Sequence, residues 1–284
     1  MIYKTLNNGV EIPMVGYGSY MMTDPGACRD VICGAIRDGY RLIDTAHMYD
    51  NHVPVGEGIR EAISRGYAKR EEIFLTTKVW FTDFETEACR KSIDKALLDL
   101  KMDYLDMVLL HWPYGNVYAA WRVLEEYYAA GKIRVIGVSN MEPDRLIDLI
   151  RFNDTKPALN QIETHLYCQQ KKAKEWMNRY DVAHEAYRPL GKATMKEMFE
   201  EPVVKAIAEK YNKSVPQVLL RFLLQSDVII IPKSSHEERV RENIDLFDFE
   251  LTSDEMEKLA ALDKDAPAVG LAETPEKTIE MIEE

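Results

Sequence analysis

Four residues of unlike chemistry stand at or just after the ends of segments that read as β-strands. Asp44 ends RLID, Tyr49 follows in TAHMY, Lys78 ends IFLTTK, and His111 ends DMVLLH. Parallel α/β barrels build their active sites at the C-terminal ends of their strands. The spacing therefore predicts that these four side chains meet in one site.

The four residues together could make a proton donor. A tyrosine hydroxyl titrates near pH ~10 and a lysine ammonium near ~10.4 in water. A positive Lys78 beside Tyr49 would favour the tyrosinate and lower the pKa of the hydroxyl. Asp44 would keep the lysine charged, and His111 would direct the tyrosine oxygen or a substrate oxygen. Such a general acid typically contributes roughly 10²–10⁴ in rate, and it suits a carbonyl oxygen that becomes an alkoxide as hydride arrives.

Three other interpretations of these residues stay open at this point. Asp44 and Lys78 could be a structural ion pair with an unrelated tyrosine and histidine nearby. Lys78 could form a Schiff base, as in an aldolase, or His47, His111 and Asp44 could ligate a metal. Neither enzymatic alternative accounts for the polar residues that follow later in the chain.

Those later residues suit a nucleotide. Lys233-Ser234 and Arg239 follow the last strand-like segment, DVIIIPKS, at the start of a helix-like one. Loops after strands 7 and 8 of such barrels often bind phosphate, helped by a helix N-terminus. Arg239 offers a planar fork for a phosphate, and Lys233 offers a point charge.

A second polar group lies at the ends of the fifth to seventh strand-like segments. Ser139, Asn140 and Gln161 offer the mixed donors and acceptors that a carboxamide requires. Tyr187 offers a flat face for stacking. Taken singly, Ser139-Asn140 could cap a helix, Gln161 could be a core amide, and Tyr187 could be packing.

The elements that must position these residues alternate regularly. A hairpin is predicted first, because YKTL and VEIP flank Asn7-Asn8-Gly9 and Asn-Gly suits a tight turn. Eight strand-like segments follow: MVGYGS, RLIDTA, EIFLTTKVW, DMVLLHW, IRVIGVSN, ALNQIE, DVAHEAY and DVIIIPKS. Helices are predicted after them, near 26–38, 55–65, 84–100, 117–130, 143–151, 169–180, 201–210 and 237–244.

This alternation predicts parallel βαβ units. Eight of them in 284 residues predict an α/β fold of the (β/α)₈ TIM-barrel type with an N-terminal hairpin. An open doubly wound sheet would usually carry a Gly-rich phosphate turn. Gly16-Tyr17-Gly18 lacks the third glycine of that fingerprint.

Composition narrows the class of protein. The net charge of −12 argues against nucleic acid as a partner, and no run approaches the roughly 20 apolar residues of a membrane span. No secretory signal is visible at the N-terminus. The cysteines at 28, 33, 89 and 168 show neither metal-ligand nor disulfide spacing, which fits a reducing cytoplasm.

Six stretches closely resemble the aldo-keto reductases. They are LIDTAHMYDN, LTTKVW, LLHWP, GKIRVIGVSN, LNQIE and IPKSSHEERVRENIDLFDFELT. The resemblance runs from the hairpin to about Leu262, in the family's order, and looks nearest to the bacterial branch that includes 2,5-diketo-gluconate reductases. It implies a single barrel domain over 1–284 that reduces aldehydes or ketones with NADPH, acting on a small-molecule carbonyl substrate, and it favours a monomer.

The resemblance also implies roles by position. Tyr49 would be the proton donor, Lys78 and Asp44 its pKa-lowering pair, and His111 the orienting residue. The positions that match cofactor contacts are Ser139, Asn140, Gln161, Tyr187, Arg188, Leu190, Lys233, Ser234, Arg239, Glu242 and Asn243. The positions that match the substrate pocket are Tyr20, His47, Trp80 and Trp112.

Two residues depart from the family pattern. Asp50 stands where a glycine usually follows the tyrosine, and Arg188 stands where a small residue usually follows the stacking aromatic. Arg188 could add a charge contact to the cofactor pyrophosphate, with a solvated loop arginine as the alternative. The substrate-side loops look short, which predicts an open pocket with modest selectivity and weak binding of small aldehydes.

Overall fold

The computed structural model describes residues 1–192, 194–268 and 275–283. The chain begins with the predicted hairpin, in which β1 (Tyr3–Thr5) pairs antiparallel with β2 (Glu11–Pro13). Gly9 in its turn has φ +83°, the left-handed region that glycine adopts without penalty. Asn7 donates to the carbonyl oxygens of Pro157 and Asp181, just before two barrel strands. The hairpin therefore closes the end of the barrel where the strands begin.

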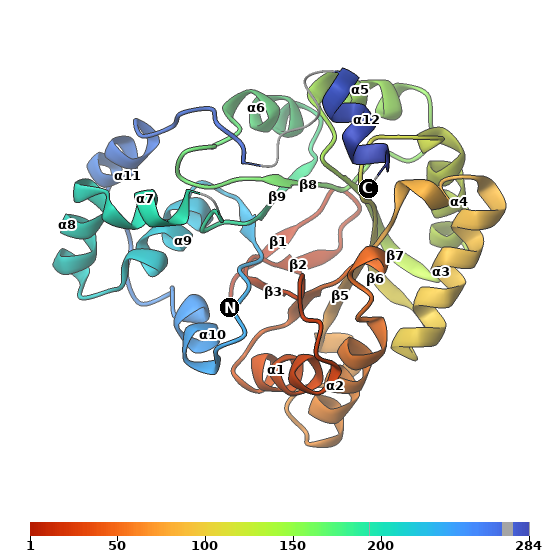
Figure 1. Ribbon diagram of the computed structural model, residues 1–284, viewed down its shortest axis with the longest axis horizontal. Coiled ribbons are helices and arrows are strands. Elements are labelled where there is room, and N and C mark those ends of the chain that lie inside the picture. The colour runs from red at the N-terminus through yellow and green to blue at the C-terminus, as the bar shows by residue number, and fades with distance from the viewer. Residues whose placement is uncertain (193, 269–274, 284) are drawn as a thin grey trace.

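Eight parallel strands form the barrel, as predicted, with helices around them (Figure 1). The strands are β3 (Gly16–Gly18), β4 (Leu42–Asp44), β5 (Phe74–Val79), β6 (Leu105–Leu110), β7 (Ile133–Ser139), β8 (Leu159–Glu163), β9 (Ala183–Tyr187) and β10 (Ile229–Ile230). They are hydrogen-bonded in sequence order. A parallel bridge between Val15 and Ile230 brings the first strand beside the last and completes the ring.

The predicted helices are present with small shifts at their ends. They are α1 (Pro25–Arg37), α2 (His52–Ser64), α3 (Thr86–Leu100), α4 (Val117–Ala129), α5 (Pro143–Arg151), α6 (Lys171–Arg179), α8 (Pro202–Tyr211) and α10 (Glu237–Ile244). Four more helices were not predicted: α7 (Met195–Glu200), α9 (Val215–Gln225), α11 (Ser253–Ala260) and α12 (Pro275–Glu283).

Two of the missed helices carried a readable start signal. Ser214 and Gln217 form a reciprocal capping box at the start of α9, and Thr252 and Glu255 form another at α11. Such a box satisfies two backbone N–H groups that a helix start leaves unpaired. In contrast, α7 occupies the segment after Tyr187 that was expected to stay a loop until about 201.

The strands of the barrel wall are buried along almost their whole length. Every residue of β5 and β6 is buried, because side chains on one face fill the barrel and those on the other pack under the helices. Gly58 lets α2 approach α1, since a Cβ there would lie 2.6 Å from the carbonyl oxygen of Arg29. Among the described helices, none has the length and apolarity to cross a bilayer.

Candidate active site

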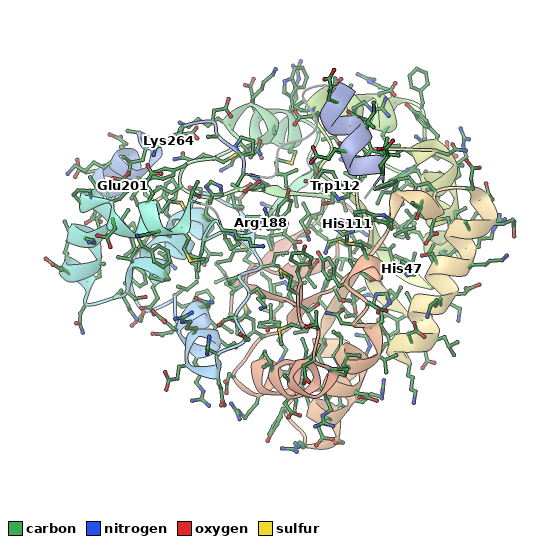
Figure 2. All side chains as sticks on the ribbon, viewed as in Figure 1. His47, His111, Trp112, Arg188, Glu201 and Lys264 are labelled. Atoms are coloured by element: carbon green, nitrogen blue, oxygen red, sulfur yellow. The ribbon has the colours of Figure 1, made fainter. Side chains whose placement is uncertain are left out.

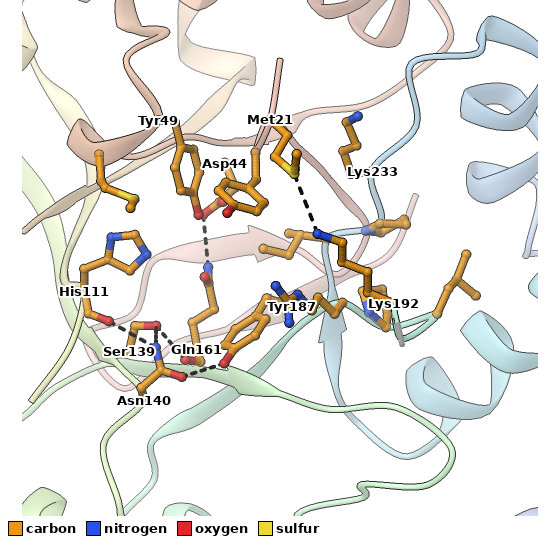
Figure 3. Close-up of a pocket in the computed structure, with 18 of the residues that line it drawn as sticks. Met21, Asp44, Tyr49, His111, Ser139, Asn140, Gln161, Tyr187, Lys192 and Lys233 are labelled. Carbon is orange, nitrogen blue, oxygen red and sulfur yellow. Dashed lines mark hydrogen bonds between the residues drawn. The ribbon is translucent and has the colours of Figure 1, made fainter. Parts of the chain in front are cut away.

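Three of the four predicted residues, Asp44, Tyr49 and Lys78, form one connected cluster. Figure 3 shows two of them, Asp44 and Tyr49, in the pocket. The ammonium of Lys78 donates to both carboxylate oxygens of Asp44 at 2.7 Å and to the carbonyl oxygen of Thr45 at 3.1 Å. It also donates to the Tyr49 hydroxyl at 3.4 Å. The Lys78 side chain is wholly inaccessible to solvent. The ammonium is thus held as a cation, unlike the free amine that a Schiff base needs.

A short turn aims Tyr49 at this pair. The 3₁₀ turn η1 (His47–Tyr49) follows β4 and ends at Asp50, whose φ of +52° lies in the left-handed region. A glycine would adopt that conformation freely, and aspartate is among the residues that tolerate it best. Asn51 fastens the turn by accepting from the Thr45 hydroxyl and donating to the Ser19 carbonyl oxygen. The first departure from the family pattern is therefore compatible with the backbone.

His111 packs edge-on against Tyr49, with ring centroids 5.7 Å apart. It packs in the same way against Trp80, at 5.0 Å. No hydrogen bond joins the histidine ring to the tyrosine hydroxyl within the described part of the chain, and its Nδ1 is buried without a partner. Burial and the charge of Lys78 hold the pKa of His111 well below its usual value, so the ring is neutral.

The pKa of Tyr49 differs from the expectation. Burial raises the pKa of this hydroxyl to about 12, and the nearby Lys78 only partly offsets the effect. Desolvation disfavours the tyrosinate more strongly than one ammonium at 3.4 Å favours it. The prediction of a lowered pKa was therefore wrong, although the direction of the Lys78 effect was right. Burial lowers the pKa of Lys78, but Asp44 outweighs it and the net shift is upward.

A hydrogen-bonded group of residues from the ends of β7, β8 and β9 lies beside His111. We call this group the polar shelf; it consists of Ser139, Asn140, Gln161 and Tyr187. Asn140, at φ +56°, donates from its amide to the His111 carbonyl oxygen at 3.1 Å and accepts from the Tyr187 hydroxyl at 2.8 Å. The Ser139 hydroxyl donates to the Gln161 carbonyl oxygen at 2.8 Å. The alternative of a helix cap is wrong, because α5 begins only after Glu142.

Gln161 links the catalytic candidates to a residue that the sequence analysis missed. Its amide nitrogen donates to Asp44 at 3.0 Å and to Glu185 on β9. Glu185 is fully buried. Its signal in the sequence was a charged residue inside the strand-like segment DVAHEAY, because a buried ionisable group needs a partner.

A pocket of about 510 Å³ opens above this cluster. It is lined by many of the predicted residues: Tyr20, Asp44, Tyr49, Trp80, His111, Trp112, Ser139, Asn140, Gln161, Tyr187, Arg188, Leu190 and Lys233. Figure 2 shows His111, Trp112 and Arg188 over the middle of the barrel. Four further lining residues were not predicted: Met21, Met48, Lys192 and Met195.

The remaining predicted residues lie outside the pocket lining. Lys78 is beneath its floor. His47 faces Asp83 instead, with Nε2 and Oδ2 3.8 Å apart, and within the described residues no cluster of three metal-ligating side chains occurs. The other four predicted residues follow β10 in the chain. They are Ser234 and, on α10, Arg239, Glu242 and Asn243.

The pocket has two chemically different halves. The loops after β3 to β6 contribute aromatic and thioether side chains, including Tyr20, Met48, Trp80 and Trp112. Apart from Asp44 in the floor, its charged lining residues among those described are Arg188, Lys192 and Lys233, which follow β9 and β10. One half suits an apolar molecule, and the other suits an anion.

A family model for the aldo/keto reductase family matches residues 16–264. The chain belongs to the aldo-keto reductase family. The glyoxal reductase of Bacillus subtilis (strain 168) is 43% identical over 261 residues, covering 92% of each chain. The NADH-dependent D-xylose reductase of Candida parapsilosis is 36% identical over 296 residues, covering 91% of each.

Solved structures agree with this assignment. The Bombyx mori aldo-keto reductase in complex with NADP superposes with a TM-score of 0.90 at 31% identity, covering 95% of each chain. The protein is thus an oxidoreductase of carbonyl groups with a nicotinamide cofactor, on a TIM barrel with an added hairpin. This family assignment leaves no need for the aldolase or metallohydrolase interpretations.

Proposed function

We propose that the protein reduces aldehydes or ketones to alcohols with NADPH and that Tyr49 is the general acid. The observation that carries this proposal is the continuous chain from the Tyr49 hydroxyl to Lys78 and Asp44 at the floor of the pocket. With a pKa of about 12, Tyr49 keeps its proton at neutral pH and has it available to donate.

Each residue of the cluster has a distinct part in the proton transfer. When bound, NADPH supplies the hydride. Tyr49 donates its proton to the carbonyl oxygen, and Lys78 stabilises the tyrosinate that is left. Asp44 keeps Lys78 protonated although both side chains are buried, and the neutral His111 can donate a hydrogen bond that directs the substrate oxygen.

The residues that we assign to the cofactor include cations that would complement the negative charges of its phosphates. Arg188, Lys233 and Arg239 make no ion pair with an acidic side chain in the part of the chain that the structure describes, and Lys192 contacts only the Met21 sulfur, at 3.8 Å. Unpaired cations at one end of a pocket suit a ligand with several phosphate charges. We assign Arg188 and Leu190 to the pyrophosphate, and Lys233, Ser234 and Arg239 to the 2′-phosphate.

The other cofactor contacts follow from the polar shelf. Ser139, Asn140 and Gln161 would hold the nicotinamide carboxamide, and Tyr187 would stack on the ring. Glu242 and Asn243 on α10 would contact the adenine. Because Asn140 bonds both His111 and Tyr187, this shelf would tie the position of the cofactor to that of the catalytic residues.

Two arginine variants test the phosphate assignments against each other. Arg239→Ala should weaken NADPH about 10- to 100-fold, as expected when a charged hydrogen bond worth ~1.5–3 kcal/mol is lost, and should leave NADH nearly unchanged. Arg188→Ser should weaken both cofactors alike at low salt, because the pyrophosphate is common to them. Dissociation constants from fluorescence titration decide this. Equal effects of Arg239→Ala on the two cofactors, or none from Arg188→Ser, would refute the respective contact.

The apolar half of the pocket indicates the kind of substrate. Met21 and Met48 are 57% and 50% exposed at its rim, and flexible thioethers adapt to ligands of different shape. We therefore expect aromatic and other apolar aldehydes to bind better than sugars, with modest selectivity and weak binding of small aldehydes. A turnover panel of aldehydes, ketones and sugars with NADPH and NADH tests the proposed function. Absence of turnover throughout would contradict it, and one tightly bound small aldehyde with its neighbours rejected would contradict the substrate class.

We also propose that the enzyme is a monomer in the cytoplasm. All four cysteines are free and buried, which suits a reducing compartment. Light scattering on the purified protein would reveal a stable dimer if this proposal were wrong.

A further inference from the structure

The buried carboxyl group of Glu185 lies beneath the polar shelf and takes no part in the proposed proton transfer. Glu185 stands on β9, opposite Gln161 on β8 and Ile229 on β10. Its Oε1 accepts from the Gln161 amide nitrogen, and its Oε2 is buried without a partner among the residues that the structure describes. An ionised carboxylate in that place would leave charge without a donor, which costs free energy because the group is fully buried.

The charges around Glu185 do not balance if every group is ionised. Asp44 from β4 and Lys78 from β5 face it, Gln161 lies between, and β10 adds only the apolar Ile229. The single ammonium is engaged by Asp44 through both oxygens. One cation with two carboxylates leaves an excess negative charge, so one proton is needed for neutrality.

Glu185 is the group in this network that titrates nearest to neutral pH. Burial and the charge of Asp44 raise the pKa of Glu185 to about 8. Further along the network, the pKa of Tyr49 is about 12 and that of His111 is far below neutral. Asp44 already accepts two hydrogen bonds from the ammonium, whereas Oε2 of Glu185 has no donor among the described residues, so we place the extra proton on Glu185.

We propose that Glu185 is a proton-linked positioning residue, protonated while the pocket above Gln161 is uncharged and partly ionised when that pocket holds positive charge. The inference rests on the proposed function, because the positive charge is that of the oxidised nicotinamide. Glu185 acts through Gln161: the amide nitrogen is committed to the two carboxyl groups, which leaves the amide oxygen to accept a hydrogen bond.

The sign of the effect follows from linkage. Positive charge in the pocket lowers the pKa of Glu185, so binding of NADP⁺ releases part of a proton below pH ~8 and becomes tighter as pH rises. The ring of NADPH is uncharged and lacks this effect. The ratio of the two dissociation constants isolates it, because both cofactors carry the same phosphates.

The test is to measure both dissociation constants by fluorescence titration across this pH range. In the wild type, the affinity for NADP⁺ relative to NADPH should rise about 3- to 10-fold between pH ~6 and ~9, for a pKa shift of about half to one unit. Glu185→Gln keeps the size of the side chain and should make the ratio independent of pH. Glu185→Asp keeps a carboxyl group and should restore a pH-dependent ratio.

Tyr49→Phe is the matched control and should keep the wild-type pH dependence, since the phenol does not titrate in this range. A second measurement needs no variant. Calorimetry of the wild type at pH ~7 in two buffers of different ionisation enthalpy should show more protons released by NADP⁺ than by NADPH. A constant wild-type ratio, equal proton release, or a Glu185→Gln ratio that still varies would overturn the inference. If neither cofactor bound, the proposed function itself would fail.

Discussion

Replacing Tyr49 by phenylalanine should lower kcat about 10²–10⁴-fold, the typical contribution of a positioned general acid. The variant loses only the hydroxyl that Lys78 contacts, so the dissociation constant for NADPH should change little. Initial rates of NADPH oxidation with a reactive aldehyde, such as a nitrobenzaldehyde, measure the effect.

Tyr114→Phe provides the matched control. Its hydroxyl is buried and has no hydrogen-bond partner in the described part of the chain, and its ring stacks on Trp112 with centroids 6.0 Å apart. Removal of this hydroxyl should leave kcat within about threefold, since no reacting or hydrogen-bonded group is lost. A non-catalytic barrel that only binds nucleotide would show little turnover in any of these proteins. Comparable rates in the wild type and Tyr49→Phe would exclude Tyr49 as the acid.

Replacing Lys78 by methionine should have a large effect on stability as well as on activity. Asp44 would keep only the Gln161 amide as a donor among the hydrogen bonds that the structure gives its carboxylate. Breaking a buried ion pair from one side typically costs about 3–5 kcal/mol. Chemical denaturation would show this loss in the free energy of unfolding, and kcat should fall with it because no cation stabilises the tyrosinate.

The double variant Asp44→Asn with Lys78→Met separates the two effects. Removing both charges takes away the unpaired carboxylate, and replacement of a whole buried pair is often neutral for stability. We expect the free energy of unfolding to recover most of the loss while kcat stays low. Recovery of kcat as well would show that the ion pair is not needed for the proton transfer. An unchanged free energy of unfolding in Lys78→Met would show that the ion pair does not stabilise the fold.

The sequence alone predicted the barrel fold, and it also predicted that residues far apart in the chain meet at one end of the barrel. Strand ends of a parallel barrel share one face, so the order of segments alone predicted that Asp44, Lys78 and His111 come together. The α9 and α11 helices were missed although their capping boxes were readable. The methionines that line the pocket were missed for another reason: Met21, Met48 and Met195 follow three different strands, β3, β4 and β9, and share no sequence pattern.

What the amino-acid sequence determined by itself is the kind of chemistry: a phenol, an ammonium, a carboxylate and an imidazole at successive strand ends, with cations after the last strands. What only the tertiary structure decided is the protonation of these groups. Desolvation depends on how completely the whole barrel excludes water, and no local pattern records that. It raises the pKa of Tyr49 instead of lowering it. The register of β8 with β9 and the closure of the barrel bring Glu185 and Asp44 to one amide of Gln161.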